Sequence, residues 1–193
     1  MNNQKKNEKH PLDGFNYCPK CGSKHFVVNN IKSKRCEDCG FIYYLNPSTA
    51  CACVITDRVN NVLVAVRRDE PAKGTWDLPG GFIDPYETVE EGLAREIQEE
   101  TGIDITKGFR GGVHSKLKYL FSLPNIYPYS GFEVHTTDLF YHLELESVIP
   151  YVGQGRDDVA ELIAVHFSEL APEKFGLDSV RQAIQKIKDK KSR

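Results

Sequence analysis

The spacing of hydrophobic residues changes along this chain, and each change predicts a different structural element. Apolar residues alternate with other residues, or form short runs, in three segments that we expect to be β-strands: residues 49–57, 62–66 and 137–145. They recur three and four residues apart in two segments that we expect to be helices, one containing Leu93 and Ile97 and one starting near Ser179. This mixture of strands and helices indicates an α/β fold.

The helix around Leu93 carries sequence signals for both of its ends. Thr88 is followed three residues later by Glu91, which is the pattern of a capping box, so we expect the helix to begin just after Thr88. Gly102 stands where a left-handed C-cap residue is expected, because glycine adopts that conformation without steric cost. The predicted helix therefore runs from just after Thr88 to just before Gly102.

Three carboxylates fall on one face of this helix, at Glu96, Glu99 and Glu100. Like charges at these spacings repel each other, and a hard divalent cation such as Mg²⁺ or Mn²⁺ is the usual way to neutralise clustered carboxylates. Arg95 lies beside them and is expected to pair with Glu87, which precedes the helix. A solvated acidic surface is the alternative interpretation of the same residues.

Three further segments have less regular patterns. Alternation predicts a short strand over residues 109–113. Residues 122–130 contain two prolines and two tyrosines, which predicts a rigid, extended loop with an aromatic surface. Residues 152–156, with two glycines, are predicted to form a flexible loop.

Near the N-terminus, four cysteines form two Cys-x-x-Cys pairs separated by 14 residues: Cys18, Cys21, Cys36 and Cys39. Four thiolates at this spacing are typical of a structural zinc ribbon, which we expect over residues 14–47. Two disulfides or a redox pair are the alternatives. The remaining two cysteines, Cys51 and Cys53, have no second pair and are expected to be small buried hydrophobic residues on one face of a strand.

The predicted ribbon is short, so its core must be small. We expect Phe26, Val27, Val28 and Ile31 to pack under the cysteines, residues 41–44 to form its last strand, and Asn46-Pro47 to link it to the next domain. Residues 1–13 are polar and expected to be frayed. Residues 1–47 carry eight Lys and Arg against four acids, which is compatible with nucleic-acid contact, although a structural or dimerisation module is the simpler interpretation.

Composition narrows the class of protein. The chain has 193 residues, of which 40% are hydrophobic and 27% charged, as in globular proteins. Its net charge of −2 argues against a general binder of polyanions. Because no apolar run approaches the roughly 20 residues of a membrane helix and the N-terminus lacks an apolar export signal, we expect a cytoplasmic protein with no membrane partner.

The residues around the acidic helix match a longer pattern. Five residues separate Gly81 from Glu87, and seven separate Glu87 from Arg95, where the run REIQEETGI begins. This spacing matches every fixed position of the Nudix box, so the chain resembles the Nudix hydrolase superfamily. The preceding segment, Lys73–Gly81, is similar to the KGxWxLPGG sequence that commonly leads into that box.

The resemblance implies a fold and a chemistry. It implies a Nudix α/β/α sandwich with mixed sheets over residues 48–172, followed by a C-terminal helix and tail over residues 173–193. Nudix enzymes hydrolyse a nucleoside diphosphate linked to another group, with carboxylate-bound divalent ions neutralising charge on the phosphate oxygens. By position, Glu96, Glu99, Glu100 and the carbonyl of Gly80 resemble the ligands of Mg²⁺ or Mn²⁺.

Three other residues receive candidate roles by position. Glu161 resembles a late Nudix glutamate that acts as an extra metal ligand or general base; one of the box glutamates, or a purely surface position for Glu161, are the alternatives. Arg67, at a strand end, is a candidate to bind substrate phosphates, and a solvated strand end is the alternative. Trp76, the only tryptophan, either packs in the core or contacts the substrate.

Nudix enzymes that carry a four-cysteine ribbon include the NADH pyrophosphatases, which have a Ser-Gln-Pro-Trp-Pro-Phe-Pro-x-Ser motif after the box. Four positions of this chain are in register with it: Ser122, Pro124, Pro128 and Ser130. Three positions depart from it: Leu123, Asn125 and Ile126. Tyr127 replaces the Phe and is a candidate to stack on a nucleobase. The departures leave the preference for a nicotinamide dinucleotide open.

The expected function is hydrolysis of the diphosphate bond of a dinucleotide such as NADH, giving two mononucleotides. An ADP-ribose or nucleoside diphosphate sugar pyrophosphatase is the second hypothesis, and a non-catalytic, nucleotide-sensing binding protein is the third. Related family members remove NAD caps from RNA and are often dimeric through the ribbon region, so the resemblance also raises NAD-capped RNA as a partner and a homodimer as the assembly.

Overall fold

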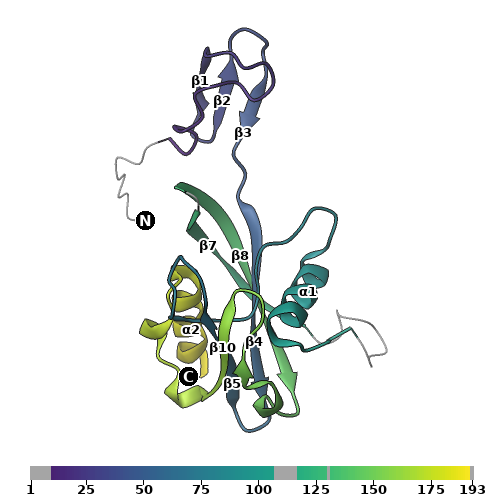
Figure 1. The fold of residues 1–193 in the computed structure, drawn as a ribbon. Helices are drawn as coiled ribbons and strands as arrows, with labels where there is room; N and C mark the ends of the chain where they lie inside the picture. The colour runs from purple at the N-terminus through teal and green to yellow at the C-terminus, as the bar shows by residue number, and fades with distance from the viewer. Residues whose placement is uncertain (1–9, 107–116, 130, 192–193) are drawn as a thin grey trace. The chain divides into compact units, whose positions relative to one another are not determined.

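A computed structural model of the chain describes residues 10–106, 117–129 and 131–191. Contacts between Cα atoms divide the chain into two compact units, Met1–Pro47 with Ser130–Glu133, and Ser48–Tyr129 with Val134–Arg193 (Figure 1). The strand predicted over residues 109–113 lies outside the described residues, as do residues 1–9 of the segment predicted to be frayed.

The first unit contains a small antiparallel sheet of three strands, β1 (Phe26–Asn30), β2 (Ser33–Cys36) and β3 (Ile42–Tyr44), in that order. Its core consists of the buried residues Cys18, Phe26 and Cys36, with three partly buried aromatic residues around them: Phe15, Phe41 and Tyr43. The final strand is therefore where the sequence predicted it.

The predicted composition of this small core is wrong at three of four positions. Phe26 is buried, but Val27, Val28 and Ile31 are exposed, Ile31 by 87%. The module has too few residues to cover both faces of its sheet. Phe26 is covered because it packs with the buried cysteines Cys18 and Cys36. The apolar residues that follow it remain exposed.

Residues 10–13, at the end of the segment predicted to be frayed, form a turn instead. The backbone N–H of Asp13 donates to the carbonyl of His10 at 2.8 Å, and the His10 ring Nε2 lies 2.7 Å from the carbonyl oxygen of Asn30. Leu12 is completely buried. One apolar residue in a polar segment is enough to order the turn around it.

The second unit is built on a mixed sheet with the strand order β7-β8-β4-β5-β10-β9, and β6 pairs with β5 beside it. The strands are β4 (Ser48–Asp57), β5 (Asn61–Arg67), β6 (Trp76–Asp77), β7 (Lys118–Tyr129), β8 (Phe132–Leu145), β9 (Gly153–Gln154) and β10 (Val159–His166). Strand β4 runs parallel to β8 and antiparallel to β5. The α/β fold with a mixed sheet is therefore confirmed.

Two helices cover the two faces of this sheet, α1 (Val89–Thr101) and α2 (Asp178–Lys191), as Figure 1 shows. Short 3₁₀ turns occupy residues Ile149–Tyr151, Phe167–Glu169 and Pro172–Lys174. Each face has its own hydrophobic core: Leu93 and Ile97 of α1 lie in the first, Val180 and Ile184 of α2 in the second. The two cores therefore lie on opposite faces of the same sheet.

Strand β4 contributes to both cores, because successive side chains of a strand point to opposite faces. Cys51 and Cys53 lie in the core under α1, whereas Ala52 and Val54 lie in the core under α2. The prediction that both cysteines are small buried residues on one face is confirmed. Burial raises the pKa of the Cys51 thiol to about 12, so this thiol stays neutral at pH 7.

The signals for the ends of α1 are also confirmed. The Thr88 hydroxyl accepts a hydrogen bond from the Glu91 N–H at 3.2 Å, and the Glu91 carboxylate accepts one from the Thr88 N–H at 2.8 Å. Gly102 ends the helix with φ of +76°, the left-handed conformation that favours glycine. The helix that carries the acidic face is thus held at both ends.

The extended loop predicted over residues 122–130 is wrong, because residues 122–129 continue strand β7. Prolines are excluded from central strands since they lack a backbone N–H. Strand β7 stands at the end of the strand order, next to β8 alone. Pro124 and Pro128 are therefore tolerated there, and the segment keeps its extended form as part of the sheet.

The flexible loop predicted over residues 152–156 is likewise partly ordered. Gly153 and Gln154 form β9, which pairs with Leu162 and Glu161 of β10. The next segment reaches α1, where the Arg156 N–H donates to the carbonyl of Glu100 at 3.2 Å. In the described part of the chain, no helix is long and apolar enough to cross a membrane.

We predict that Thr88→Ala lowers the free energy of unfolding by about 1 kcal/mol, because it removes the acceptor for a helix N–H. Thr88→Ser keeps the hydroxyl and should unfold within a few tenths of a kcal/mol of the natural chain. Urea unfolding followed by circular dichroism measures both. Equal stability of the two variants would contradict a stabilising role for the capping box.

Candidate active site

A glycine turn brings the segment after β6 against strand β4. The N–H of Cys51 donates to the Gly81 carbonyl at 2.9 Å, and the N–H of Cys53 donates to the Pro79 carbonyl at 2.8 Å. Gly80 has φ of +147°, and a Cβ atom there would lie 2.2 Å from the Cys51 carbonyl oxygen. Only glycine permits this approach of two backbones.

The next glycine makes room for a carboxylate. A Cβ atom on Gly81 would lie 2.7 Å from the carboxyl carbon of Glu96. Glu100, one helical turn further along α1, accepts a hydrogen bond from the Gly80 N–H at 3.0 Å. The two glycines therefore face two of the three predicted acidic residues, Glu96 and Glu100.

Glu100 is a buried acid, with 4% of its surface exposed. Burial, together with the negative charge of Asp158, raises its pKa well above the ordinary value. Burial also raises the pKa of Glu96, although the hydrogen bond from Arg95 opposes that shift. Two carboxylates that resist ionisation side by side form a site that a cation would stabilise.

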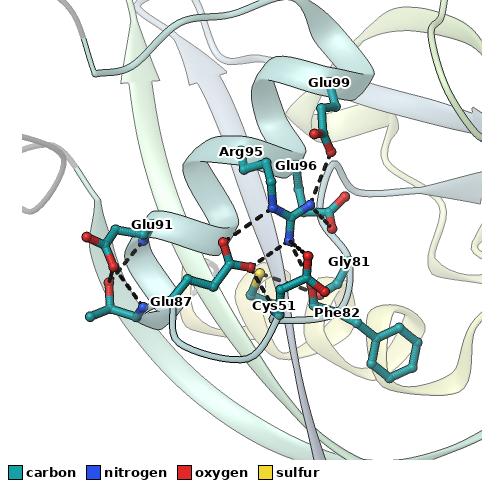
Figure 2. Close-up of polar contacts among 10 residues, drawn as sticks. Cys51, Gly81, Phe82, Glu87, Glu91, Arg95, Glu96 and Glu99 are labelled. Carbon is teal, nitrogen blue, oxygen red and sulfur yellow. Dashed lines mark hydrogen bonds and ion pairs between the residues drawn. The ribbon is translucent and has the colours of Figure 1, made fainter.

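Arg95 lies at the centre of the acidic residues, as Figure 2 shows. Its guanidinium contacts Glu87 at 2.7 Å, Glu96 at 2.8 Å and Glu99 at 3.1 Å. It also donates to the carbonyl of Phe82 at 3.2 Å. The expected pairing of Arg95 with Glu87 is present, and the hydrogen bond from Arg95 lowers the pKa of the Glu87 carboxyl.

The three acidic side chains share a helix face, but they are not gathered around one point. Among the described residues, the four ribbon cysteines are the only group of three or more possible ligands whose ligand atoms all lie within 4.8 Å of one another. Arg95 holds Glu96 and Glu99, and Gly80 holds Glu100. A cation shared by all three would require Glu96 or Glu99 to turn away from Arg95.

A cavity of about 110 Å³ opens beside the glycine turn, and Gly80, Gly81, Arg67, Tyr127 and Asp158 are among the residues that line it. Arg67 donates to the Asp77 carboxylate at 2.6 Å, to the Pro71 carbonyl at 2.8 Å and to the Tyr127 hydroxyl at 3.3 Å. The structure thus places two predicted substrate-binding residues, Arg67 and Tyr127, in contact on one cavity wall.

The third candidate, Trp76, is not among the residues that line this cavity. Its ring packs edge-on against Phe175 with centroids 5.8 Å apart, and the Lys174 ammonium lies 4.3 Å from its centre. Trp76 is partly buried and packs against the core under α2. Of the two interpretations of this residue, its position favours packing.

Glu161 does not join the acidic cluster either. It is exposed on β10, and alternation places its side chain on the face of Ile163 and Val165, opposite the face covered by α1. Asp158, which precedes that strand, lines the cavity instead, and its charge raises the pKa of Glu96 and Glu100. Sequence reasoning missed Asp158, and the acidic pair before β10 was the available signal.

The four ribbon cysteines form a separate cluster in the first unit. The Cys18 and Cys39 sulfurs are 3.8 Å apart, and the Cys21 and Cys36 sulfurs are 3.7 Å apart. Four sulfurs about 2.3 Å from a tetrahedral ion would lie about 3.8 Å from each other, whereas a disulfide needs about 2.05 Å. The cysteines are unbridged and spaced to hold one metal ion.

Comparison with known proteins agrees with this site. Residues 46–185 match the family model described as the NUDIX domain, which covers more than half of the chain. The chain belongs to the NUDIX family. The match spans the acidic helix, the glycine turn and the cavity of the NUDIX domain.

The relatives of this NUDIX protein are named for different substrates. The NAD-capped RNA hydrolase NudC of Vibrio atlanticus is 28% identical over 121 residues, which are 63% of this chain and 41% of that protein. The ADP-ribose pyrophosphatase of Methanocaldococcus jannaschii is 47% identical over 60 residues, 31% of this chain and 35% of that protein. The matched part is thus less than half of either relative.

Among solved structures, a NUDIX hydrolase from Nitrosomonas europaea is similar to this chain with a TM-score of 0.64 and 18% identity, covering 90% of each chain. At this identity the likeness supports the fold of the NUDIX domain.

We predict that alanine destabilises the protein much more at Gly80 than at Gly81. Gly80→Ala should lower the free energy of unfolding by about 2–4 kcal/mol, because its Cβ meets backbone atoms of β4 in a strained conformation. Gly81→Ala should cost less than about 1 kcal/mol, because its Cβ meets the movable end of Glu96. Urea unfolding of both variants measures the difference, and a more damaging Gly81→Ala would contradict this account of the turn.

Proposed function

We propose that this NUDIX protein hydrolyses the diphosphate bond of a dinucleotide such as NADH and releases two mononucleotides. The observation that carries the proposal is the partly buried Glu96 and the buried Glu100, which lie against Gly81 and Gly80, two residues that line a cavity. Burial makes ionisation of these carboxyl groups unfavourable unless a cation binds to them. A cation bound there would also neutralise the charge on the phosphate oxygens of a substrate.

The donor set fits Mg²⁺ or Mn²⁺, which prefer carboxylate and carbonyl oxygens. Glu96, Glu99, Glu100 and the carbonyl oxygen of Gly80 would hold the ion. When bound, such an ion would neutralise charge on the non-bridging and leaving oxygens of the diphosphate. The Gly80 N–H orients the proposed ligand Glu100, and Arg95 holds Glu87, which is not a ligand, against the helix.

Two acids outside the acidic helix are candidates for activating the attacking water. Asp158 lines the cavity and is close enough to the acidic helix to raise the pKa of Glu100, so its position favours it over the exposed Glu161. One of the box glutamates remains a further candidate. Arg67, which lines the same cavity, would bind the substrate phosphates through guanidinium N–H groups while its partner Asp77 keeps it in place.

The choice of dinucleotide rests on relatives and on Tyr127. NudC is named for NAD-capped RNA, a substrate that contains the same dinucleotide diphosphate bond, so NAD-capped RNA is included in the proposal. Tyr127 lies edge-on to Phe82 with ring centroids 5.7 Å apart, and this aromatic wall is suited to a flat ring.

ADP-ribose is the second candidate substrate. It is favoured by the 47% identity over 60 residues to an ADP-ribose pyrophosphatase. A homodimer and a cytoplasmic location remain predictions.

A substrate panel with Glu100→Gln tests the enzymatic proposal. With Mg²⁺ or Mn²⁺, we expect the natural chain to have its highest kcat/KM for NADH or NAD⁺ when compared with ADP-ribose and nucleoside triphosphates. Glu100→Gln should lower kcat about 100-fold or more while circular dichroism stays unchanged, because it removes a ligand charge but keeps the oxygen that faces Gly80. Normal turnover by this variant would refute the ligand assignment, and a lead for ADP-ribose would select the second candidate.

For the ribbon we propose one structural Zn²⁺ held by Cys18, Cys21, Cys36 and Cys39. Elemental analysis of reduced protein should find about one zinc per chain, and Cys36→Ser should abolish it, since a closed four-thiolate site needs all its ligands. Cys53→Ser is the matched control and should keep the zinc. Zinc-free natural protein would contradict the site.

A further inference from the structure

The cavity beside the glycine turn extends along strand β8, where two polar side chains form part of its wall. These are Thr136 and Asp138, which are 3% and 8% exposed. They lie two residues apart on one strand, so they share a face. Neither the Thr136 hydroxyl oxygen nor the Asp138 Oδ1 atom has a hydrogen-bond partner among the described residues.

Such atoms are uncommon in folded proteins, because a buried polar group without a partner costs about 1–3 kcal/mol. Asp138 is not free to turn away from the cavity. Its other oxygen, Oδ2, accepts a hydrogen bond from the Ser179 hydroxyl at 2.5 Å, and Ser179 is a completely buried residue of α2. The carboxylate is therefore held in place with one acceptor atom unused.

The surroundings of these two groups are apolar and aromatic. Ala52, Phe140 and Val180 line the same cavity. Tyr127 lines it too, and its hydroxyl is held by Arg67 at 3.3 Å. A cavity of about 110 Å³ is small beside the roughly 300–1,000 Å³ of ordinary ligand pockets, so it suits one flat end of a substrate.

We propose that Thr136 and Asp138 select a planar group that carries an amino substituent beside a hydrogen-bond acceptor. The amino group donates to Asp138 Oδ1, and the Thr136 hydroxyl donates to the neighbouring acceptor. In the substrates proposed above, two groups have this chemistry: the adenine base and the carboxamide of nicotinamide. The inference rests on the proposed function, since it assigns one end of that substrate.

The same geometry disfavours other rings. Guanine presents two adjacent N–H donors that suit both oxygens of a carboxylate, but Ser179 already occupies Oδ2 of Asp138. Hypoxanthine replaces the amino group of adenine by a carbonyl, which would place two acceptors against each other. The nicotinic acid analogue replaces the carboxamide by a carboxylate, with the same consequence.

Asp138→Asn tests the proposal because it keeps the shape of the side chain and exchanges an acceptor for a donor. An asparagine can still accept from Ser179 while its NH₂ faces the cavity. We would measure kcat/KM for ADP-ribose against its hypoxanthine analogue, and for NAD⁺ against its nicotinic acid analogue. The natural chain should prefer the amino form of one pair by about tenfold or more, and Asp138→Asn should abolish or reverse that preference.

Thr136→Val is a second test variant, and Thr137→Val on the same strand is its matched control. Thr136→Val removes the buried hydroxyl and should weaken the same preference. Thr137 is exposed and points to the other side of β8, so Thr137→Val should leave every ratio unchanged. Thermal unfolding of each variant identifies any loss of fold.

The outcomes show whether adenine or the nicotinamide carboxamide binds in the cavity. They also distinguish a failure of this inference from a failure of the proposed hydrolysis. A change in the hypoxanthine ratio identifies adenine as the bound group, and a change in the nicotinic acid ratio identifies the carboxamide. Unchanged ratios in a folded, active Asp138→Asn would overturn the inference and leave the proposed hydrolysis standing.

If the natural chain hydrolyses none of these compounds, the proposed function fails instead. Calorimetric binding of AMP against IMP, and of the nicotinamide against the nicotinic acid mononucleotide, then tests the pocket directly. Equal affinities within both pairs would refute it.

Discussion

The candidate active site depends on one close approach between two stretches of backbone. Gly80 lies so near the Cys51 carbonyl that no side chain fits between them, and this contact sets the glycine turn against β4. The same residue donates its N–H to Glu100. The turn therefore positions a buried acid of α1 relative to the central sheet, and the cavity, the acidic helix and the wall of β8 meet around it.

The site is supported by a strand that is buried on both faces. Cys53 and Ile55 of β4 lie in the core under α1, and Ala52 and Val54 lie in the core under α2. Small residues such as Cys51 and Ala52 let the glycine turn and the cavity come close to the strand. Both helices therefore pack on the strand against which the glycine turn lies.

Arg95 supplies positive charge at the centre of the acidic residues. The guanidinium contacts three glutamates, of which Glu96 and Glu99 are proposed metal ligands. Among the described residues, no cationic side chain pairs with Glu100, whose carboxylate accepts a hydrogen bond from a backbone N–H, and burial raises its pKa well above the ordinary value. A divalent ion would take over the role of counter-charge that Arg95 fills for two of the three acids.

Local patterns in the sequence predicted the elements whose formation depends on nearby residues. The capping box at Thr88, the C-cap at Gly102 and the buried face of β4 are confirmed, because each depends on residues within a few positions. The NUDIX box placed the acids on one helical face for the same reason. The wrong predictions concern which side chains are buried and which segments pair in a sheet. Val28 was expected in the ribbon core but is exposed, because the module is too small to cover it. Pro124 was expected in a loop but lies in a strand, because that strand is at the edge of the sheet.

The amino-acid sequence by itself determined the family, the acidic helix and the four-cysteine module, since these are recorded in fixed spacings along the chain. Only the tertiary structure decided that Asp158 lines the cavity while Glu161 does not, and that Asp138 of β8 faces the same cavity as Gly80. Asp138 and Asp158 follow Gly80 by 58 and 78 positions in the chain, and their proximity to it follows from strand order and helix packing. No spacing rule along the chain records that proximity.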